Sequence, residues 1–118
     1  MATYSRILLS GSTSGLPVIV VAVATAGTLI HTAVTGAAAF DEVYLWASNV
    51  TASTATLTVE WGGVADPGSL MVKAVSLPPN SPPIPIATGQ VLNGGLVCRA
   101  FSGTASAINI TGFVNRIQ

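Results

Sequence analysis

The residues that could carry chemistry are few: four acids, one histidine and one cysteine in 118 residues. The acids are Asp41, Glu42, Glu60 and Asp66. Glycoside hydrolysis needs two carboxylates held across a cleft, and Glu42 and Glu60 stand in two successive predicted strands. The alternation of polar and apolar residues puts both of them at positions that should face solvent. We therefore expect no catalytic residues and a protein that is not an enzyme, with a hydrolase using this pair as a formal alternative.

The single histidine and the single cysteine lack the neighbours that would make them reactive. His31 has no acid or cysteine nearby in the sequence, so it is more typical of a packed or interfacial residue than of a metal ligand. Cys98 lies in an apolar run and is predicted to be a small buried hydrophobic residue. The Gly-Gly pairs lack the Lys-Ser/Thr and the helix of a phosphate loop. We expect no metal and no cofactor.

Aromatic residues gather in the stretch "DEVYLWASNVTASTATLTVEWGG", residues 41–63, which holds both tryptophans. Tyr44, Trp46 and Trp61 could together stack on a sugar ring, which keeps a carbohydrate-binding module as an alternative. Alternation places Trp61 with Leu57 and Val59 on the face expected to join the core.

The same alternation puts Tyr44 and Trp46 on the second face of their strand, beside Glu42. In the C-terminal strand, Phe113 falls on the second face in the same way. Such faces either close the sandwich or meet a partner. Tyr44, Trp46 and Phe113 are therefore the candidate protein-contact residues.

Short runs rich in Val, Ile, Thr and Leu, separated by Gly, Pro, Asn and Ser, must position these side chains. A spacing near ten residues predicts an all-β fold: one antiparallel β-sandwich, jelly-roll-like, of about eight strands over residues 1–118, with another Greek-key sandwich as the second choice. Residues 1–15 are a candidate extended N-terminal arm. Residues 42–48 and 55–61 are predicted to form a hairpin, and "PPNSPPIP" a rigid loop or a sheet edge. The predicted strands are 5–9, 18–24, 28–34, 42–48, 55–61, 70–77, 90–92, 96–101 and 107–117.

The composition limits the partners. Hydrophobic residues make up 50% of the chain, charged residues 7%, and the net charge is zero. An average soluble domain has about 25% charged residues, so we expect a surface rich in neutral Ser, Thr, Asn and Gly that is also partly buried against other chains. The four cations are scattered, which argues against nucleic-acid binding. The longest apolar run, residues 16–24, is too short to cross a membrane and is predicted to be a buried strand. The N-terminus lacks the arrangement of a signal peptide, so synthesis in a cytoplasm is expected.

The order of the motifs "GTLIHTAVTG", "FDEVYLWASN", "LTVEWGG" and "INITGFVNRI" resembles a group of small proteins encoded by tailed bacteriophages. The resemblance covers about residues 27–117 and consists of strand motifs rather than catalytic residues. It implies a virion structural protein: a decoration, or cement, protein that binds the outer capsid surface and stabilises contacts between major capsid proteins.

The partners implied are the major capsid protein and further copies of the chain. Capsid lattices offer threefold positions, which favours a homotrimer, with a homodimer at twofold positions as the alternative. Residues 5–24 are expected to help anchor the chain to the capsid or to a neighbouring subunit. An all-β chain of this kind could instead be a tail or connector component, or an adsorption module that binds carbohydrate on the virion surface.

Overall fold

The computed structural model describes residues 2–118, which form nine β-strands. The strands are β1 (Tyr4–Leu8), β2 (Val18–Ile19), β3 (Thr28–Thr32), β4 (Phe40–Asn49), β5 (Ala55–Trp61), β6 (Leu70–Leu77), β7 (Ile84–Leu92), β8 (Val97–Ser102) and β9 (Ile108–Ile117). Among the described residues, no helix is long and apolar enough to cross a membrane.

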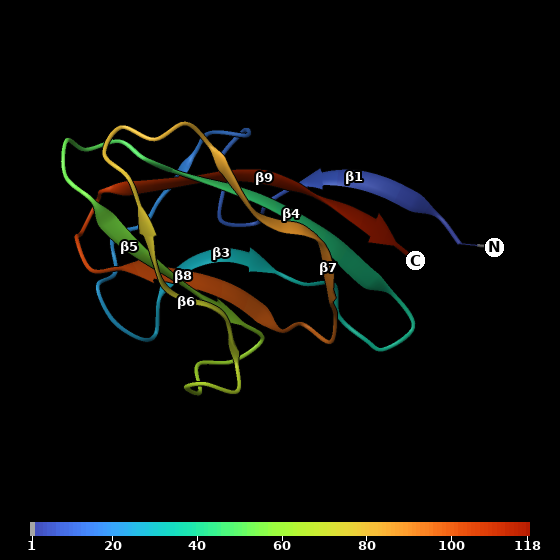
Figure 1. Ribbon diagram of the computed structural model, residues 1–118. Coiled ribbons are helices and arrows are strands. Elements are labelled where there is room, and N and C mark those ends of the chain that lie inside the picture. The colour runs from blue at the N-terminus through green and yellow to red at the C-terminus, as the bar shows by residue number, and fades with distance from the viewer. Residues whose placement is uncertain (1) are drawn as a thin grey trace.

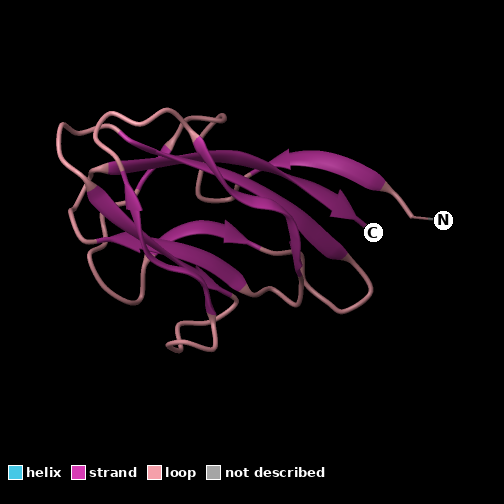
Figure 2. Cartoon of the chain, viewed as in Figure 1, coloured by secondary structure: helices cyan, strands magenta, loops and turns pink. Residues whose placement is uncertain are grey.

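The strands form two antiparallel sheets packed face to face (Figures 1 and 2). The first, sheet A, has the order β1-β9-β4-β7, and the short β2 continues the line of β1 along β9. The second, sheet B, has the order β3-β8-β5-β6. From β2 to β9 successive strands alternate between the sheets, except that β5 and β6 are neighbours in sheet B, and β9 returns to lie beside β1. This is the strand order of a jelly roll. The predicted jelly-roll-like β-sandwich is confirmed.

The core lies between the two sheets, where alternate side chains meet. Val43, Leu45 and Ala47 of β4 face Leu57 and Val59 of β5 across this interior, and all five are fully buried. The two-residue period of a strand explains the pattern, because every second side chain points to the same face. The alternation read from the sequence therefore identified the inward faces of β4 and β5 correctly.

The predicted hairpin of residues 42–48 and 55–61 is wrong. β4 pairs with β7 and β9 in sheet A, whereas β5 pairs with β6 and β8 in sheet B. The connection between them crosses from one sheet to the other, and the buried Asn49 organises it. Its side-chain amide donates to the carbonyls of Ser53 and Leu77, while its oxygen accepts from Thr51. These contacts satisfy a polar side chain that would otherwise be costly to bury.

Part of the N-terminal segment closes one side of the sandwich. Residues 4–8, within the candidate arm, form β1 along β9. Beyond β1 the chain turns to sheet B, where the Gly11 amide donates to the Ile30 carbonyl and the Ser10 hydroxyl accepts from the Thr32 amide. A Cβ atom on Gly11 would collide with the backbone carbonyl oxygens of Leu29 and Ile30 in β3, so only glycine permits this approach.

The apolar run 16–24 is not the buried strand that its composition predicted. Only Val18 and Ile19 are in a strand, and burial alternates: Val18 and Val20 are buried, whereas Ile19 and Val21 are exposed. The segment runs along the edge of the sandwich, where one side contacts the core and the other faces outward. Apolar runs of this length do not distinguish a central strand from an edge segment.

The proline-rich stretch forms a loop followed by an edge strand. Residues 78–83 are irregular, and β7 begins at Ile84, six residues before the predicted start of this strand. Pro85 lies within β7, which is the outermost strand of sheet A on that side. An edge strand tolerates proline because one side of its backbone has no strand to bond.

Candidate functional site

The outer face of sheet A can be traced from the strand registers. Ser5, Arg116 and Asp41 lie in one row across β1, β9 and β4, and Ile7, Val114 and Val43 lie in a parallel row. Val43 and Val114 are fully buried, so these rows point inward. The rows between them must point outward. These outward rows contain Tyr4, Ile117 and Phe40; Arg6, Asn115 and Glu42; and Leu8, Phe113 and Tyr44, and the next row adds Thr111 and Trp46.

Tyr44, Trp46 and Phe113 form one cluster on this face, named here the aromatic cluster. The rings of Tyr44 and Phe113 are stacked, with centroids 4.8 Å apart and an interplanar angle of 15°. The Trp46 ring lies 6.1 Å from that of Phe113. Because Tyr44 and Phe113 are cross-strand neighbours in the β4–β9 register, their stacking also stabilises this pairing of strands. The three candidate contact residues are thus brought together on one surface and remain half-buried.

Further apolar side chains extend the aromatic cluster toward β1. Tyr4 is 72% exposed and Leu8 is 52% exposed, and Leu8 lies directly beside Phe113 in the register. The Arg6 guanidinium lies 4.5 Å from the centroid of the Phe113 ring, a cation–π geometry. The sequence did not identify Tyr4, Arg6 and Leu8 as candidate contact residues. A strand of five residues does not show in its sequence which longer strand it will pair with.

The two glutamates considered above as a catalytic pair lie on different sheets. Glu42 is on the outer face of sheet A, whereas Glu60 is on the far side of sheet B. Glu60 was expected to face solvent, and this expectation is wrong, because its side chain is fully buried. Its carboxylate accepts hydrogen bonds from the Thr25 hydroxyl and, at 2.7 Å, from the Gly27 amide. Glu60 therefore fixes the loop that crosses from β2 to β3, and the paired-carboxylate geometry is not assembled.

The sugar platform of Tyr44, Trp46 and Trp61 is not assembled either. Trp61 belongs to sheet B, where it packs against the core, as its alternation with Leu57 and Val59 predicted. Its indole N–H points to the carbonyl of Val91, with a separation of 3.4 Å. The aromatic residue that joins Tyr44 and Trp46 is Phe113, which is 67 residues after Trp46 in the chain.

His31 lies in a buried polar cluster that links the two sheets. Its Nδ1 accepts from the Ser10 amide at 3.0 Å, so Nε2 carries the ring proton and donates to Asp41 at 2.8 Å. Arg116 donates to both oxygens of Asp41, at 2.8 and 3.0 Å, and the Val34 amide adds a bond of 3.1 Å. The expectation of a packed histidine is confirmed. The nearby acid that the sequence did not reveal is Asp41.

The electrostatics of this cluster favour the charged form of Asp41. Burial by itself raises the pKa of the carboxyl, but the hydrogen bonds from Arg116, His31 and Val34 outweigh burial, and the pKa lies below its ordinary value. The same contact raises the pKa of Arg116. The cluster has the features of a structural ion pair, since Asp41 has no exposed surface and every carboxylate contact is made within the fold.

Cys98 is fully buried in β8, as predicted, opposite His31 in the β3–β8 register. Burial raises the pKa of its thiol to about 12. Thiolate is the reactive form, so this cysteine is unsuited to nucleophilic chemistry in the folded protein.

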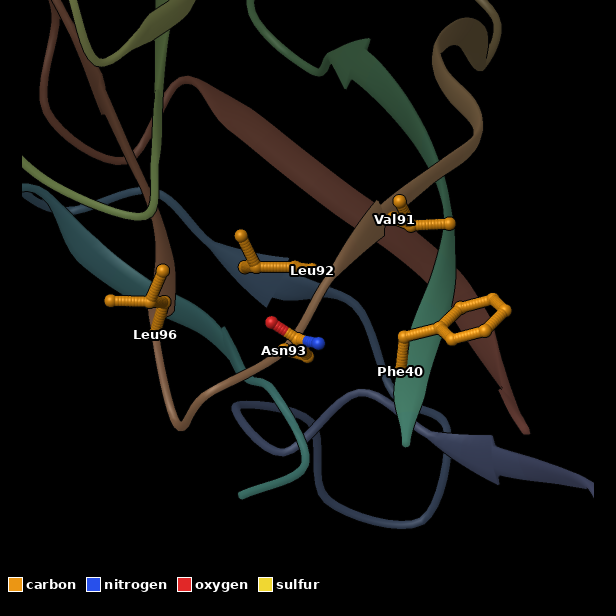
Figure 3. A pocket seen from close by; sticks show the side chains of 5 residues that line it. All are labelled: Phe40, Val91, Leu92, Asn93 and Leu96. Atoms are coloured by element: carbon orange, nitrogen blue, oxygen red, sulfur yellow. The ribbon is translucent and has the colours of Figure 1, made fainter. Parts of the chain in front are cut away.

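Two of the hollows on the described surface are lined by residues outside the aromatic cluster. One, of about 440 Å³, is lined by Phe40, Val91, Leu92, Asn93 and Leu96. Figure 3 shows that Phe40 comes from the start of β4 and Val91 from the end of β7, while Asn93 and Leu96 follow on the turn to β8. The other, of about 300 Å³, lies over sheet B and includes Glu60, Thr25 and Phe101. The first is mainly apolar and holds no titratable side chain.

Within residues 2–118 no group of three or more His, Cys, Asp or Glu side chains is arranged to hold a metal ion. Comparison with models of protein families, with curated proteins and with solved structures found no match to this chain. The geometry therefore defines the class of the protein as a jelly-roll β-sandwich with an outward-facing aromatic cluster on sheet A.

Proposed function

We propose that this protein is a structural component of a bacteriophage virion, a decoration or cement protein that binds the outer capsid surface. In this role it stabilises contacts between major capsid proteins and associates with further copies of itself. The observation that carries the proposal is the outer face of sheet A. There the aromatic cluster, with Leu8 beside it and Tyr4 farther along β1 on the same face, forms a mainly apolar surface on a chain with 7% charged residues.

Two physical arguments support a contact role for this face. Clusters of aromatic side chains that are flanked by exposed apolar ones are typical of protein–protein interfaces, where they supply most of the binding free energy. Of the residues placed on this face by the strand registers, only Arg6 and Glu42 are charged, so docking would require little desolvation of charge. The jelly roll also recurs in viral capsid and lectin domains, although a fold by itself does not define a function.

The proposal can be tested by reconstitution with capsids. The chain and the major capsid protein encoded in the same genome would be produced separately, and assembled shells would be mixed with the chain and sedimented. We expect the wild-type chain to sediment with the shells. We expect Trp46→Ala to reduce its occupancy at least tenfold, since truncation of a central aromatic anchor typically costs about 2 kcal/mol or more.

Thr104→Ala, an exposed change on a loop between β8 and β9, is the matched control and should sediment like the wild type. Thermal unfolding of each variant separates lost contact from lost folding. A folded wild-type chain that never sediments with shells would overturn the proposal. Electron microscopy that places the chain at the tail would instead support a connector role. Glycan binding on an array that is lost in Trp46→Ala would support an adsorption module.

A further inference from the structure

The outer edge of β1 differs from the other edges of the two sheets. β7 contains Pro85 and two register shifts against β4, and β6 has two register shifts against β5. The edge of β3 has a register shift and is bonded by Ser10 and Gly11. β1, in contrast, pairs with β9 in unbroken register from Tyr4 to Leu8. Proline, bulges and covering loops are three common means of preventing edge-to-edge pairing, and β1 has none of these three, although it is short and carries one charged side chain, Arg6.

The backbone groups that β1 leaves free can be identified from its hydrogen bonds. Thr3 and Gln118 exchange both backbone bonds, so they are a hydrogen-bonded pair of the antiparallel ladder. Such pairs alternate, which makes Ser5 and Ile7 the next residues whose backbone faces β9. The N–H and C=O groups of Tyr4, Arg6 and Leu8 therefore point away from β9 within the plane of the sheet, toward the side where no described strand lies.

We propose that β1 of one copy pairs antiparallel with β1 of a second copy, forming a twofold dimer. The side chains of paired residues must lie on the same face, which leaves three central registers: Ser5, Arg6 or Ile7 opposite itself. A centre at Arg6 sets two like charges opposite each other, which is destabilising. A centre at Ile7 pairs Arg6 with Leu8 but leaves the free backbone groups of Tyr4 without a partner in β1 of the second copy.

The register centred on Ser5 keeps the two Arg6 side chains from facing each other, and it pairs all three residues whose backbone groups are free. It forms hydrogen-bonded pairs between Tyr4 of one copy and Arg6 of the other, and between Leu8 and Ala2. Arg6 already lies over the Phe113 ring, so in the dimer its guanidinium lies between two aromatic side chains, Phe113 and the Tyr4 of the second copy. Tyr4, which is 72% exposed in the single chain, gains a partner in the same arrangement.

The dimer joins two copies of sheet A into one continuous sheet. A twofold axis perpendicular to this sheet puts both aromatic clusters on the same side. Figure 1 shows that β1 and both chain termini lie at one end of the sandwich, away from sheet B. The inference rests on the proposed function only in that both include self-association, and it favours the dimer over the trimer. Two clusters on one side would strengthen binding to a repetitive shell through avidity.

Cysteine cross-linking of the purified full chain, without capsids, tests the register. Ser5 would face its own copy as a non-hydrogen-bonded pair with Cα atoms about 4.5 Å apart, within the range of a disulfide. We expect Ser5→Cys to form a disulfide-linked dimer under mild oxidation. Arg6→Cys should cross-link at least tenfold more slowly, because its two copies would lie diagonally about 7–8 Å apart. Thr88→Cys on β7 is the control for random collision, and Cys98 is buried in every variant.

Substitutions at Arg6 test the backbone pairing itself. Arg6→Ala and Arg6→Pro both remove the guanidinium, but only proline removes the outward amide, and it leaves the bonds to β9 intact. Sedimentation equilibrium should show a dimer dissociation constant at least tenfold higher for Arg6→Pro than for Arg6→Ala, with similar thermal unfolding. A wild-type chain that stays monomeric at high concentration overturns the inference. So does a dimer in which Ser5→Cys links no faster than Thr88→Cys. Neither result bears on capsid binding, which is measured separately by sedimentation with shells.

Discussion

Asp41 and Arg116 occupy opposed positions on β4 and β9, and the guanidinium contacts both carboxylate oxygens on the inner side of sheet A. His31 reaches the same carboxylate from sheet B. The contact thus joins the two sheets at the end of the sandwich where both chain termini lie (Figure 1). This buried polar contact holds β4 and β9 together on their inner side, while their outer side carries the aromatic cluster.

Asp41→Asn should lower the free energy of unfolding by about 2–4 kcal/mol. Breaking a fully buried pair costs about 3–5 kcal/mol, and the lower value applies because the Arg116 side chain is 26% exposed. Urea unfolding followed by tryptophan fluorescence measures the change. Asp66→Asn is the control, because the Asp66–Lys73 pair is exposed and should contribute at most about 1 kcal/mol. Equal losses in the two variants would contradict the importance of the buried cluster.

The stability of the wild-type protein should fall in acid. The pKa of Asp41 is lower in the folded state than its unfolded value of about 3.9, so the unfolded chain binds the proton more tightly. The contribution of Asp41 is therefore complete above the unfolded value and is lost as pH falls below it toward the folded pKa. Urea unfolding at a series of pH values should show the gap between wild type and Asp41→Asn narrowing below about pH 4. A gap that stays constant into acid would contradict the lowered pKa.

Glu60→Gln should destabilise the protein by about 1–3 kcal/mol. The amide nitrogen of glutamine cannot accept a hydrogen bond, so both contacts survive only if the Thr25 hydroxyl turns to accept from this nitrogen, and both then lose the carboxylate charge that strengthens them. Glu42→Gln makes the same chemical change on the outer face of sheet A and should stay within about 0.5 kcal/mol of wild type. Thermal unfolding of the two variants compares them directly. A Glu42 variant as unstable as the Glu60 variant would show that the assigned contacts are not the cause.

Gly112→Ala should destabilise the β4–β9 pairing. A Cβ atom at this position would collide with the backbone carbonyl of Tyr44, so the two strands would have to separate beside the aromatic cluster. We expect a loss of about 1–3 kcal/mol, as for other overpacked sites. Gly68→Ala, where a Cβ would meet no atom within 4 Å, is the control. Wild-type stability in Gly112→Ala would contradict the close approach.

Cys98 should not react with a thiol reagent while the protein is folded. Its pKa is raised to about 12 by burial, so the thiolate is scarce at pH 8, and the reagent cannot reach the sulfur. A chromogenic disulfide reagent should detect one thiol per chain in denaturant and almost none without it. Thr88→Cys, on an exposed edge strand, should react at once and confirm that the reagent is active. Rapid labelling of folded wild type would contradict the burial of Cys98.

Much of the strand content could be predicted because it depends on local pattern. The bounds of β5 and β6 agree with the predicted segments 55–61 and 70–77, and the Asn-Gly-Gly turn lies where it was expected. Turn residues and alternating apolar positions act over a few neighbours, so they are visible in one sequence. The burial of Thr58 and Glu60 could not be predicted in this way. Alternation puts them outward correctly, but it does not show that the loop between β2 and β3 and the strand β6 cover them.

The candidate contact residues show the same division. Alternation alone put Tyr44, Trp46 and Phe113 on outward faces. Their contact with one another depends on the pairing of β4 with β9, whose residues are about 70 positions apart. The predicted hairpin was wrong because short-range turn signals do not show whether a connection stays within one sheet or crosses to the other.

The sequence by itself determined most of the strands, the jelly-roll-like sandwich class and the inward faces of β4, β5 and β9, because a two-residue period and turn chemistry are local properties. Only the tertiary structure decided which side chains meet. It brought His31, Asp41 and Arg116 together, moved Glu60 into a buried site far from Glu42, and stacked Phe113 on Tyr44. These contacts arise from strand pairings between distant parts of the chain, and the cooperative packing of two whole sheets selects them rather than any neighbouring residues.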